Sequence, residues 1–386
     1  MKSVKIITII KEDLIFFPPA ISLLRILSEL NYTVVHIGYY SDDNQRHLLE
    51  SLGVKFCKAP HYRTEGNALS KFVDIIKFKK YVKDVLRRET ITSDDYIWVI
   101  NPANMIPLYS ILGKYRTILQ FYEFARPNVT KSYKIYNPFI DLTDICKKAD
   151  KIVHCDYTRA LFFKEMYGLK KVPYVIPNKP NIDESLLLSP PQDIIERVNQ
   201  IKKMVNGKKV ILYQGVFSPK ERRLDEFCDA IQQLPDDYVF LAMGRGGEYF
   251  EQISKKYKDD DRIILVDFIR PPFHLLVTKM AHIGVLTYFP ATTNVASVIN
   301  VFYCAPNKIF EFAKYGIPMI SNNLPGLAYT FQQYNCGMCI EDVTVPTSIC
   351  DVINNIENNY LSYSDGALNY YNSVDLKDNI SNVLES

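Results

Sequence analysis

Several features that would indicate a particular class of protein are missing from this chain of 386 residues. It contains no run of about 18 apolar residues, so we predict no membrane-spanning helix. The eight cysteines are scattered and suggest no disulfide framework. Cys336 and Cys339 form a lone CxxC pair without a second pair, so we predict no metal site. Scattered thiols are typical of a reducing compartment, and we expect a cytoplasmic location.

The hydrophobic pattern alternates between short apolar runs and segments with helical spacing. Runs such as 4–10, 32–39 and 95–100 are rich in β-branched residues, as in strands buried within a parallel sheet, and helical spacing follows the first two. This rhythm predicts an α/β protein with doubly wound parallel sheets. The polar, proline-rich stretch 178–191, NKPNIDESLLLSPP, interrupts the rhythm, and we interpret it as a linker between two domains.

Residues 282–326 contain the clearest single unit of this pattern. We predict a buried strand over 283–289, a polar loop, a helix that Pro306 opens and Gly316 closes, a second strand, and a turn at 324–326. Strand, loop, helix and strand in this order form one βαβ unit of a parallel sheet.

Two charged residues stand in the first turns of the helix that follows Pro306. Lys308 and Glu311 are three residues apart and share a face of this helix. A cation in the first turn opposes the helix dipole, so an anionic ligand would explain Lys308 better than local stability does. Glu311 lies among apolar residues and needs polar partners, which sugar hydroxyls could provide. The alternative is an ordinary surface ion pair.

The segment 306–326, PNKIFEFAKYGIPMISNNLPG, resembles the donor-site signature of GT-B glycosyltransferases, specifically glycosyltransferase family 4. That signature has a Glu in a short helix, then a small residue, Gly, any residue, Pro, a strand and Pro-Gly. The resemblance implies the GT-B fold, in which two doubly wound Rossmann-like domains face a cleft. It implies an acceptor-binding domain over 1–177, a nucleotide-sugar domain over 192–365, and a C-terminal helix over 366–386 that returns to the first domain.

The resemblance also implies roles for residues around this segment. The family Glu that corresponds to Glu311 binds the ribose hydroxyls of the sugar nucleotide. A second family Glu usually stands eight residues earlier, where this chain has Tyr303. The donor sugar must then be held by other groups, and Asn300, Asn307 and the backbone of 303–305 are candidates.

A second part of the donor site is expected after the strand at 210–213. Gly215 stands where the family uses glycine to let the backbone approach the donor diphosphate, and a helix is predicted over 223–234. Arg222 and Arg223 supply counter-charge that suits phosphate oxygens. Lys308, Arg223 and the N–H of Gly215 would neutralise the leaving diphosphate without a metal or cofactor. By themselves these residues could equally form an ordinary basic loop.

Two more assignments follow from the resemblance. Glu123 falls where the family usually has His-Glu, near the acceptor and the reacting carbon, so we assign it to the catalytic site; the alternative is an ordinary acid at a strand end. Residues 267–272 correspond to the loop that holds the nucleotide base, mainly through backbone groups.

The first half of the chain is basic, although the net charge is only +3. Residues 1–176 carry 27 Lys and Arg against 18 Asp and Glu, which suggests an anionic surface or substrate. The stretch 70–88, SKFVDIIKFKKYVKDVLRR, is basic and amphipathic, and such a helix can lie on an anionic membrane. Its predicted apolar stripe is Phe72, Ile75, Ile76, Val82, Val85 and Leu86. The alternative is a helix that packs this stripe on its own sheet.

These observations predict a retaining glycosyltransferase that moves a sugar from a nucleotide-diphosphate sugar to an acceptor hydroxyl. We expect a glycan or lipid-linked acceptor, a role in bacterial surface polysaccharide or glycolipid assembly, and no nucleic-acid partner. The enzyme is expected in the cytoplasm, with peripheral membrane attachment through 70–88. Alternatives are a GT-B epimerase, a two-lobed binding protein, or a non-catalytic nucleotide-sugar-binding GT-B protein.

Overall fold

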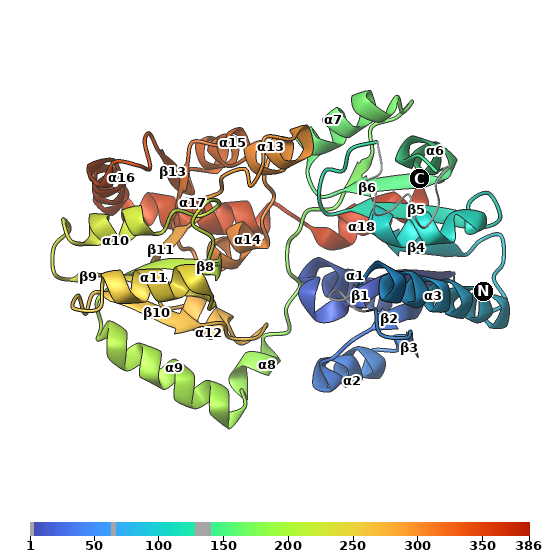
Figure 1. Ribbon diagram of the computed structural model, residues 1–386, viewed down its shortest axis with the longest axis horizontal. Helices are drawn as coiled ribbons and strands as arrows, with labels where there is room; N and C mark the ends of the chain where they lie inside the picture. The colour runs from blue at the N-terminus through green and yellow to red at the C-terminus, as the bar shows by residue number, and fades with distance from the viewer. Residues whose placement is uncertain (1–3, 63–66, 128–139) are drawn as a thin grey trace. The chain divides into compact units, whose positions relative to one another are not determined.

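The computed structural model describes residues 4–62, 67–127 and 140–386, and the chain divides into two compact units (Figure 1). The N-terminal unit consists of Met1–Asn181 together with Asp375–Ser386, and the C-terminal unit is Ile182–Val374. Each unit contains one parallel sheet flanked by helices. In the part of the chain that the structure describes, no helix is long and apolar enough to cross a bilayer.

The sheet of the N-terminal unit has seven parallel strands in the order β3-β2-β1-β4-β5-β6-β7. The chain builds outward from β1 in one direction and then from β4 in the other, so the sheet is doubly wound. All five residues of β4 are buried, as the continuous apolar run predicted. The strands are β1 (Lys5–Asp13), β2 (Thr33–Tyr39), β3 (Lys55–Lys58), β4 (Tyr96–Ile100), β5 (Arg116–Phe121), β6 (Lys151–His154) and β7 (Tyr174–Val175).

The helices of this unit connect successive strands, and most begin with a side-chain cap. Asp42, Asn67, Asp141 and Asp156 each accept a hydrogen bond from a backbone N–H of the helix that follows. The helices are η1 (Leu14–Phe16), α1 (Pro18–Glu29), α2 (Asp43–Ser51), α3 (Ala68–Arg88), α4 (Pro102–Met105), η2 (Ile106–Ile111), α6 (Leu142–Lys148), α7 (Tyr157–Tyr167) and α18 (Leu376–Glu385).

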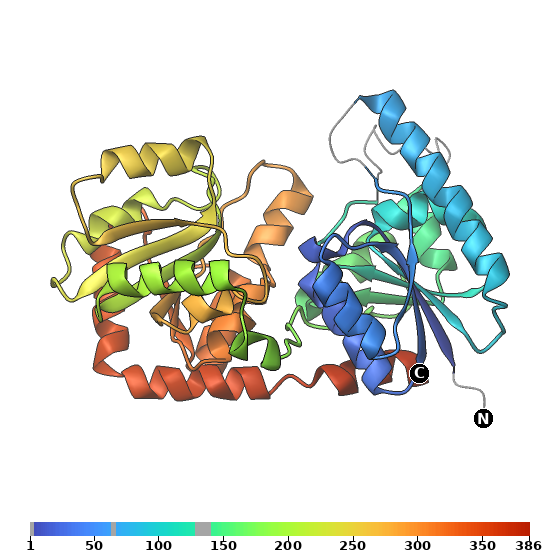
Figure 2. The ribbon, with the colours of Figure 1, turned by 90° about the horizontal axis from the view of Figure 1, so that it is seen from below.

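The last helix of the chain, α18, belongs to the N-terminal unit and packs on α1 (Figure 2). Lys377 lies 2.9 Å from the carboxylate of Glu29 on α1. The buried ammonium of Lys151 on β6 donates to the carbonyl of Val383 at 2.6 Å and satisfies a free carbonyl at the helix end. The predicted single helix over 366–386 is thus two elements, because α17 (Tyr360–Asn372) ends before α18 begins.

The C-terminal unit has a six-stranded parallel sheet in the order β10-β9-β8-β11-β12-β13. The order reverses between β8 and β11. The strands are β8 (Lys209–Val216), β9 (Tyr238–Arg245), β10 (Ile263–Asp267), β11 (Ala281–Val285), β12 (Met319–Asn322) and β13 (Gly337–Ile340). The helices are α8 (Ser185–Leu188), α9 (Gln192–Val205), α10 (Asp225–Ile231), α11 (Glu248–Lys256), α12 (Leu275–Thr278), α13 (Val295–Phe302), α14 (Asn307–Ala313), α15 (Pro325–Tyr334), α16 (Pro346–Asn358) and α17.

Helices cover both faces of this sheet, because alternate residues of each strand point to opposite faces. On β8, Val210 and Leu212 join one core with buried residues of α9, α14 and α15. Ile211 and Tyr213 join a second core with buried residues of α10, α11 and α16. Both faces of the strand are therefore apolar, which explains the unbroken hydrophobic run in the sequence.

Four local features of the C-terminal unit differ from the predictions. The polar loop predicted after 283–289 contains α13, which the side chain of Asn294 caps by accepting from the N–H of Ser297 at 3.0 Å. The turn predicted at 324–326 is the start of α15, where Pro325 suits the first helical position. The helix predicted from Arg223 begins at Asp225, because Arg223 has φ +50° and cannot belong to a right-handed helix. The predicted linker also contains α8.

Candidate functional site

Four of the predicted donor-site residues gather where the sheet order of the C-terminal unit reverses, namely Gly215, Arg222, Lys308 and Glu311. Gly215 lies near the carboxyl end of β8, and Tyr288 follows β11, the strand next to β8. In doubly wound sheets, ligands bind outside the carboxyl ends of the strands at such a switch point. A doubly wound sheet was predicted, but the strands between which its order reverses are known only from the structure.

Local sequence places α14 as predicted. Pro306 is the N-cap of the helix, and Gly316 adopts φ +64° just beyond its end. Ile309 and Phe312 are buried, and the ring of Phe312 lies against β11 so closely that a Cβ on Gly284 would be 2.6 Å from it. This packing fixes the rotation of α14 and with it the direction of Lys308 and Glu311.

Glu311 lies in a buried hydrogen-bond network. Its side chain is buried, with 7% of the residue exposed. Gln214 of β8 donates from Nε2 to Oε2 of Glu311 at 2.6 Å, and Thr278 donates to Oε1 of Gln214 at 2.8 Å. Nε2 of His274 lies 3.3 Å from Oε1 of Glu311. The expectation that this carboxylate needs polar partners is met by the protein itself, with an amide and an imidazole.

The charge of Glu311 is stabilised by these neighbours. Burial alone raises the pKa of the Glu311 carboxyl. Attraction to His274 and Lys308, together with the hydrogen bond from the amide, outweighs burial, so the pKa lies below its ordinary value. The site therefore keeps a buried carboxylate that is ionised at neutral pH.

Neither His274 nor Gln214 was assigned to the site in the sequence analysis. His274 precedes the one-turn helix α12 and is 37 residues from Glu311. No spacing along the chain connects these residues, because only the sheet brings β8, α12 and α14 together. Nδ1 of His274 is buried and has no hydrogen-bond partner among residues 4–62, 67–127 and 140–386.

Lys308 and Arg222 form a cationic site beside this network. A Cβ on Gly215 would lie 2.6 Å from Nζ of Lys308, so the ammonium occupies the space that the glycine leaves open. Nζ is 5.9 Å from the ring centres of both Tyr213 and Tyr288, and Cζ of Arg222 is 4.8 Å from the centre of Tyr288. Neither cation has a carboxylate within ion-pair distance in the described part of the chain.

Arg222 contributes to the lowered pKa of Lys308. Burial is the main reason that the pKa of Lys308 falls to about 8, and the neighbouring guanidinium of Arg222 lowers it further, against the attraction of Glu311. Nε of Arg222 is buried without a hydrogen-bond partner among the residues that the structure describes. Two cations that repel each other without an ion-pair partner favour a bound anion.

The loop that carries Arg222 is held in place by the segment after β11. The hydroxyl of Thr287 donates to the carbonyl of Arg222 at 2.9 Å, and the N–H of Phe289 donates to the carbonyl of Glu221 at 3.0 Å. The side-chain amide of Asn322, at the end of β12, bonds both the N–H and the carbonyl of Tyr288. Tyr288 is thus a fixed platform for the guanidinium of Arg222.

The structure does not bring Arg223 to Lys308. The guanidinium of Arg223 lies over the ring of Phe289, 4.8 Å from its centre, and 3.8 Å from the carboxylate of Glu226. Arg223 and Lys220 line a separate hollow of about 470 Å³. Adjacent arginines therefore point to different places, because the left-handed backbone at Arg223 turns the chain between them.

The other predicted residues are placed as follows. Asn307 is the first residue of α14 and precedes Lys308, and Tyr303 ends α13, where a Cβ on Gly326 would be 2.9 Å from its Cα. Glu123 is exposed and follows β5 in the N-terminal unit. In the described part of the chain, no group of three or more His, Cys, Asp or Glu residues could hold a metal ion.

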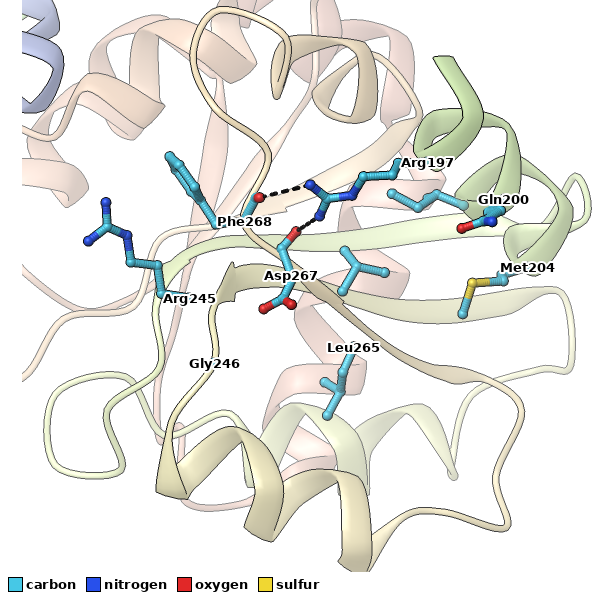
Figure 3. Close-up of a pocket in the computed structure, with 10 residues that line it drawn as sticks. Arg197, Gln200, Met204, Arg245, Gly246, Leu265, Asp267 and Phe268 are labelled. Carbon is cyan, nitrogen blue, oxygen red and sulfur yellow. Dashed lines mark hydrogen bonds between the residues drawn. The ribbon is translucent and has the colours of Figure 1, made fainter. Parts of the chain in front are cut away.

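A pocket of about 530 Å³ adjoins the loop that was predicted to hold a nucleotide base (Figure 3). The guanidinium of Arg197 on α9 donates to the carbonyls of Asp267 and Phe268, at 2.9 and 3.3 Å. Arg245 is the last residue of β9, and its guanidinium carbon lies over the ring of Phe268, 5.3 Å from the ring centre. The pocket thus combines an exposed aromatic ring with backbone groups and two guanidinium groups.

Comparison with solved structures identifies the fold. HepE from Anabaena, solved with UDP and glucose, is 14% identical and superposes with a TM-score of 0.68, covering 99% of this chain and 100% of that one. A glycosyltransferase from Rickettsia africae is 13% identical, with a TM-score of 0.66 over 100% and 95% of the two chains. WaaG, a glycosyltransferase of lipopolysaccharide biosynthesis, is 12% identical, with a TM-score of 0.59 over 98% of each chain.

These similarities cover the whole chain, and the fold is GT-B, with two doubly wound Rossmann-like domains as predicted. No family model matches the sequence, and no curated protein matches it.

Proposed function

We propose that this protein is a glycosyltransferase that moves a sugar from a nucleotide-diphosphate sugar to an acceptor hydroxyl. The observation that carries the proposal is the pairing of an anion site with a buried carboxylate at one switch point. Lys308 and Arg222 face no carboxylate partner within ion-pair distance among the described residues, and Glu311 lies one helical turn from Lys308. A nucleoside diphosphate has both an anionic diphosphate and a ribose diol, and it fits this combination.

In the proposed reaction the bond between the anomeric carbon and the diphosphate breaks, and a bond to the acceptor oxygen forms. The nucleoside diphosphate leaves with the bonding electrons, and one of its phosphate oxygens takes the proton of the acceptor hydroxyl. Lys308, Arg222 and the N–H of Gly215 stabilise the charge that develops on the leaving diphosphate. The configuration at the anomeric carbon is retained, and no metal is required.

Other groups complete the proposed site. Glu311 binds the ribose hydroxyls, while Asn307 and the backbone at Tyr303 hold the donor sugar. The base lies at the 267–272 loop, and a uridine donor is the first choice because the similar HepE was solved with UDP and with UDP-glucose. Arg223 was predicted to share the diphosphate, and its placement over Phe289 favours Arg222 for this role.

Glu123 keeps its proposed place near the acceptor, in the 1–177 domain. A glycan or lipid-linked acceptor and a cytoplasmic role in surface polysaccharide or glycolipid assembly complete the proposal. The similarity to WaaG, which acts in lipopolysaccharide biosynthesis, and the basic first half of the chain favour this setting.

Calorimetric titration tests the donor site. UDP, GDP and ADP and their glucose conjugates are titrated into wild type, Arg222→Gln and Arg223→Gln. The two variants each remove one positive charge, and the two positions are adjacent in the sequence, so Arg223→Gln is a matched control. Loss of a charge-assisted hydrogen bond should weaken binding of the preferred nucleotide at least about tenfold in Arg222→Gln. Arg223→Gln should stay within about twofold of wild type.

Three results would contradict the proposal. Equal losses in both variants would show that the cations act only through net charge. No binding of any nucleotide by wild type would reject the donor site. Donor binding without transfer to any acceptor in a glycan panel would instead favour a non-catalytic nucleotide-sugar-binding protein.

A further inference from the structure

A glutamine stands at a core position of β8. Gln214 is two residues beyond Leu212, so its side chain points to the face of the sheet that α14 covers. It is only 3% exposed. An amide without hydrogen-bond partners is costly at such a position, whereas an apolar side chain would carry no such cost. The hydrogen bonds of Gln214 must therefore explain why an amide stands there.

Glu311 and Thr278 fix the direction of this amide. The ionised carboxylate of Glu311 can only accept, so the amide turns its N–H groups toward it, with Nε2 of Gln214 2.6 Å from Oε2 of Glu311. Oε1 of Gln214 then needs a donor, and the hydroxyl of Thr278 on α12 donates to it at 2.8 Å. The hydrogen bonds thus run in one direction, from Thr278 through Gln214 to Glu311.

This arrangement leaves room for two further donors at Glu311. Gln214 occupies one lone pair of Oε2, and Nε2 of His274 lies 3.3 Å from Oε1. A carboxylate has about four lone-pair sites, so each oxygen can accept one more hydrogen bond. The side chain of Glu311 is 8% exposed, which leaves an edge that a ligand can reach. Two neighbouring hydroxyl groups would fill the two remaining sites.

Folding stability alone does not account for this network. Replacing a buried charged group and its partners with apolar residues of similar volume often leaves stability unchanged or raises it. The network instead lies beside the cations Lys308 and Arg222, and Lys308 stands one helical turn before Glu311. Buried partners that hold one carboxylate in a fixed orientation beside an anion site suit a ligand with both hydroxyl and phosphate groups.

We propose that Thr278 and Gln214 are positioning residues that turn the carboxylate of Glu311 toward both ribose hydroxyls of the donor, and that they make the site selective for ribonucleotides over 2′-deoxyribonucleotides. The inference rests on the proposed donor site and adds the source of its selectivity for the nucleotide sugar ring. Thr278 is fully buried and Gln214 nearly so, so both act through Glu311. Without the hydroxyl of Thr278, the amide loses the contact that holds it against Glu311, and the carboxylate can rotate.

Calorimetric titration with a pair of nucleotides tests this role. The pair is whichever of UDP, GDP and ADP binds wild type most tightly, together with its 2′-deoxy counterpart. Loss of one hydrogen bond to a carboxylate should make wild type bind the deoxynucleotide about tenfold more weakly. Glu311→Gln removes the charged acceptor and should bring the two dissociation constants to within about threefold of each other.

Thr278→Val keeps the shape of the side chain and removes its hydroxyl. Binding of the ribonucleotide should weaken, and its preference over the deoxynucleotide should fall at least about threefold. Thr278→Ser retains the hydroxyl and should keep the wild-type preference despite the lost methyl group. Gln214→Met removes the amide and should behave as Thr278→Val does, so it gives the same test if Thr278→Val fails to fold.

Thr8→Val is the matched control in the N-terminal unit. Thr8 is also fully buried, and its hydroxyl lies 2.8 Å from Nδ1 of the buried His36. The same substitution there removes a comparable hydrogen bond, so folding stability should fall by a similar amount while the preference for the ribonucleotide stays at the wild-type value. The comparison separates positioning of Glu311 from general destabilisation.

The outcomes distinguish failure of this inference from failure of the donor site. Equal affinity of wild type for both nucleotides would overturn the inference and leave the donor site standing. A wild-type preference in both Thr278→Val and Gln214→Met, or an equal loss of preference in Thr8→Val, would overturn it as well. No binding of any nucleotide by wild type would reject the proposed function and this inference with it.

Discussion

Binding of the nucleotide donor should weaken as the pH rises through the pKa of Lys308. Burial, with help from Arg222, lowers this pKa to about 8, so the ammonium loses its proton in an accessible range. If only the charged form binds the diphosphate, the competent fraction falls from about nine-tenths at pH 7 to about one-tenth at pH 9, and the apparent Kd rises about tenfold. Burial raises the pKa values of Tyr213 and Tyr288, so these neighbours stay neutral.

Isothermal titration of the preferred nucleotide sugar at pH 6.5, 7, 8 and 9 measures this dependence. The same series with Lys308→Arg is the control, because a guanidinium remains charged throughout. Whatever its absolute affinity, that variant should show a flat pH profile apart from titration of the nucleotide itself. Subtraction of the two profiles isolates the contribution of Lys308.

The folding stability of the unliganded protein should depend on pH in the opposite direction to donor affinity, which provides an internal check. The folded pKa of Lys308 lies below its unfolded value of 10.5, so the unfolded chain binds more protons between pH 8 and 10.5. The contribution of Lys308 to unliganded stability therefore rises with pH in that window while donor affinity falls. Parallel pH profiles for wild type and Lys308→Arg would refute the assignment of the ammonium to the diphosphate.

Three further predictions concern other parts of the structure. Gly215→Ala should weaken donor binding about tenfold in calorimetry, because its Cβ would meet Nζ of Lys308. Gly168→Ala is the control, because Gly168 has φ +58° but no atom close to its Cβ position. This control should cost about 1 kcal/mol of folding stability and leave donor affinity unchanged. His274→Phe removes a partner of the buried Glu311 and should lower the free energy of unfolding by about 1–3 kcal/mol. Glu311 has a lowered pKa, so the stability that its carboxylate contributes is lost as pH falls below the unfolded value of 4.5. Loss of His274 raises the folded pKa of Glu311, so His274→Phe should lose less stability than wild type between pH 7 and pH 3, which melting at the two pH values measures. Lys151→Met should destabilise the full chain by about 1–3 kcal/mol in urea, but should cost much less in a chain ending at residue 374, which lacks the carbonyls of α18 that Lys151 caps. An equal loss of stability in both chains would mean that Lys151 stabilises the protein through groups other than the carbonyls of α18.

Much of the fold could be predicted because its signals are local. Unbroken β-branched runs predicted the strands, and Pro306 and Gly316 correctly bracketed the helix that carries Lys308 and Glu311. Helix α13 was missed because it is only 8 residues long and its start depends on the side-chain cap at Asn294.

The details of the site depend on tertiary structure and could not be predicted. Gln214 and His274 reach Glu311 only because β8 and α12 pack beside α14. The sequence offers no means of choosing between Arg222 and Arg223, because the choice depends on a single left-handed backbone position. Likewise, the sequence left open whether the apolar stripe predicted over 70–88 lies on a membrane or packs on the sheet. Only the packed structure shows that most of this stripe is in the core, with Ile75, Val82, Val85 and Leu86 buried.

The central claim is that a nucleotide diphosphate binds at the switch point of the C-terminal sheet. A crystal structure of the protein with the tightest-binding nucleotide diphosphate tests it most directly. The account predicts phosphate oxygens within hydrogen-bond distance of Lys308, Arg222 and the N–H of Gly215, with the ribose at Glu311. Phosphates bound at Lys220 and Arg223, with the Lys308 site empty, would contradict it.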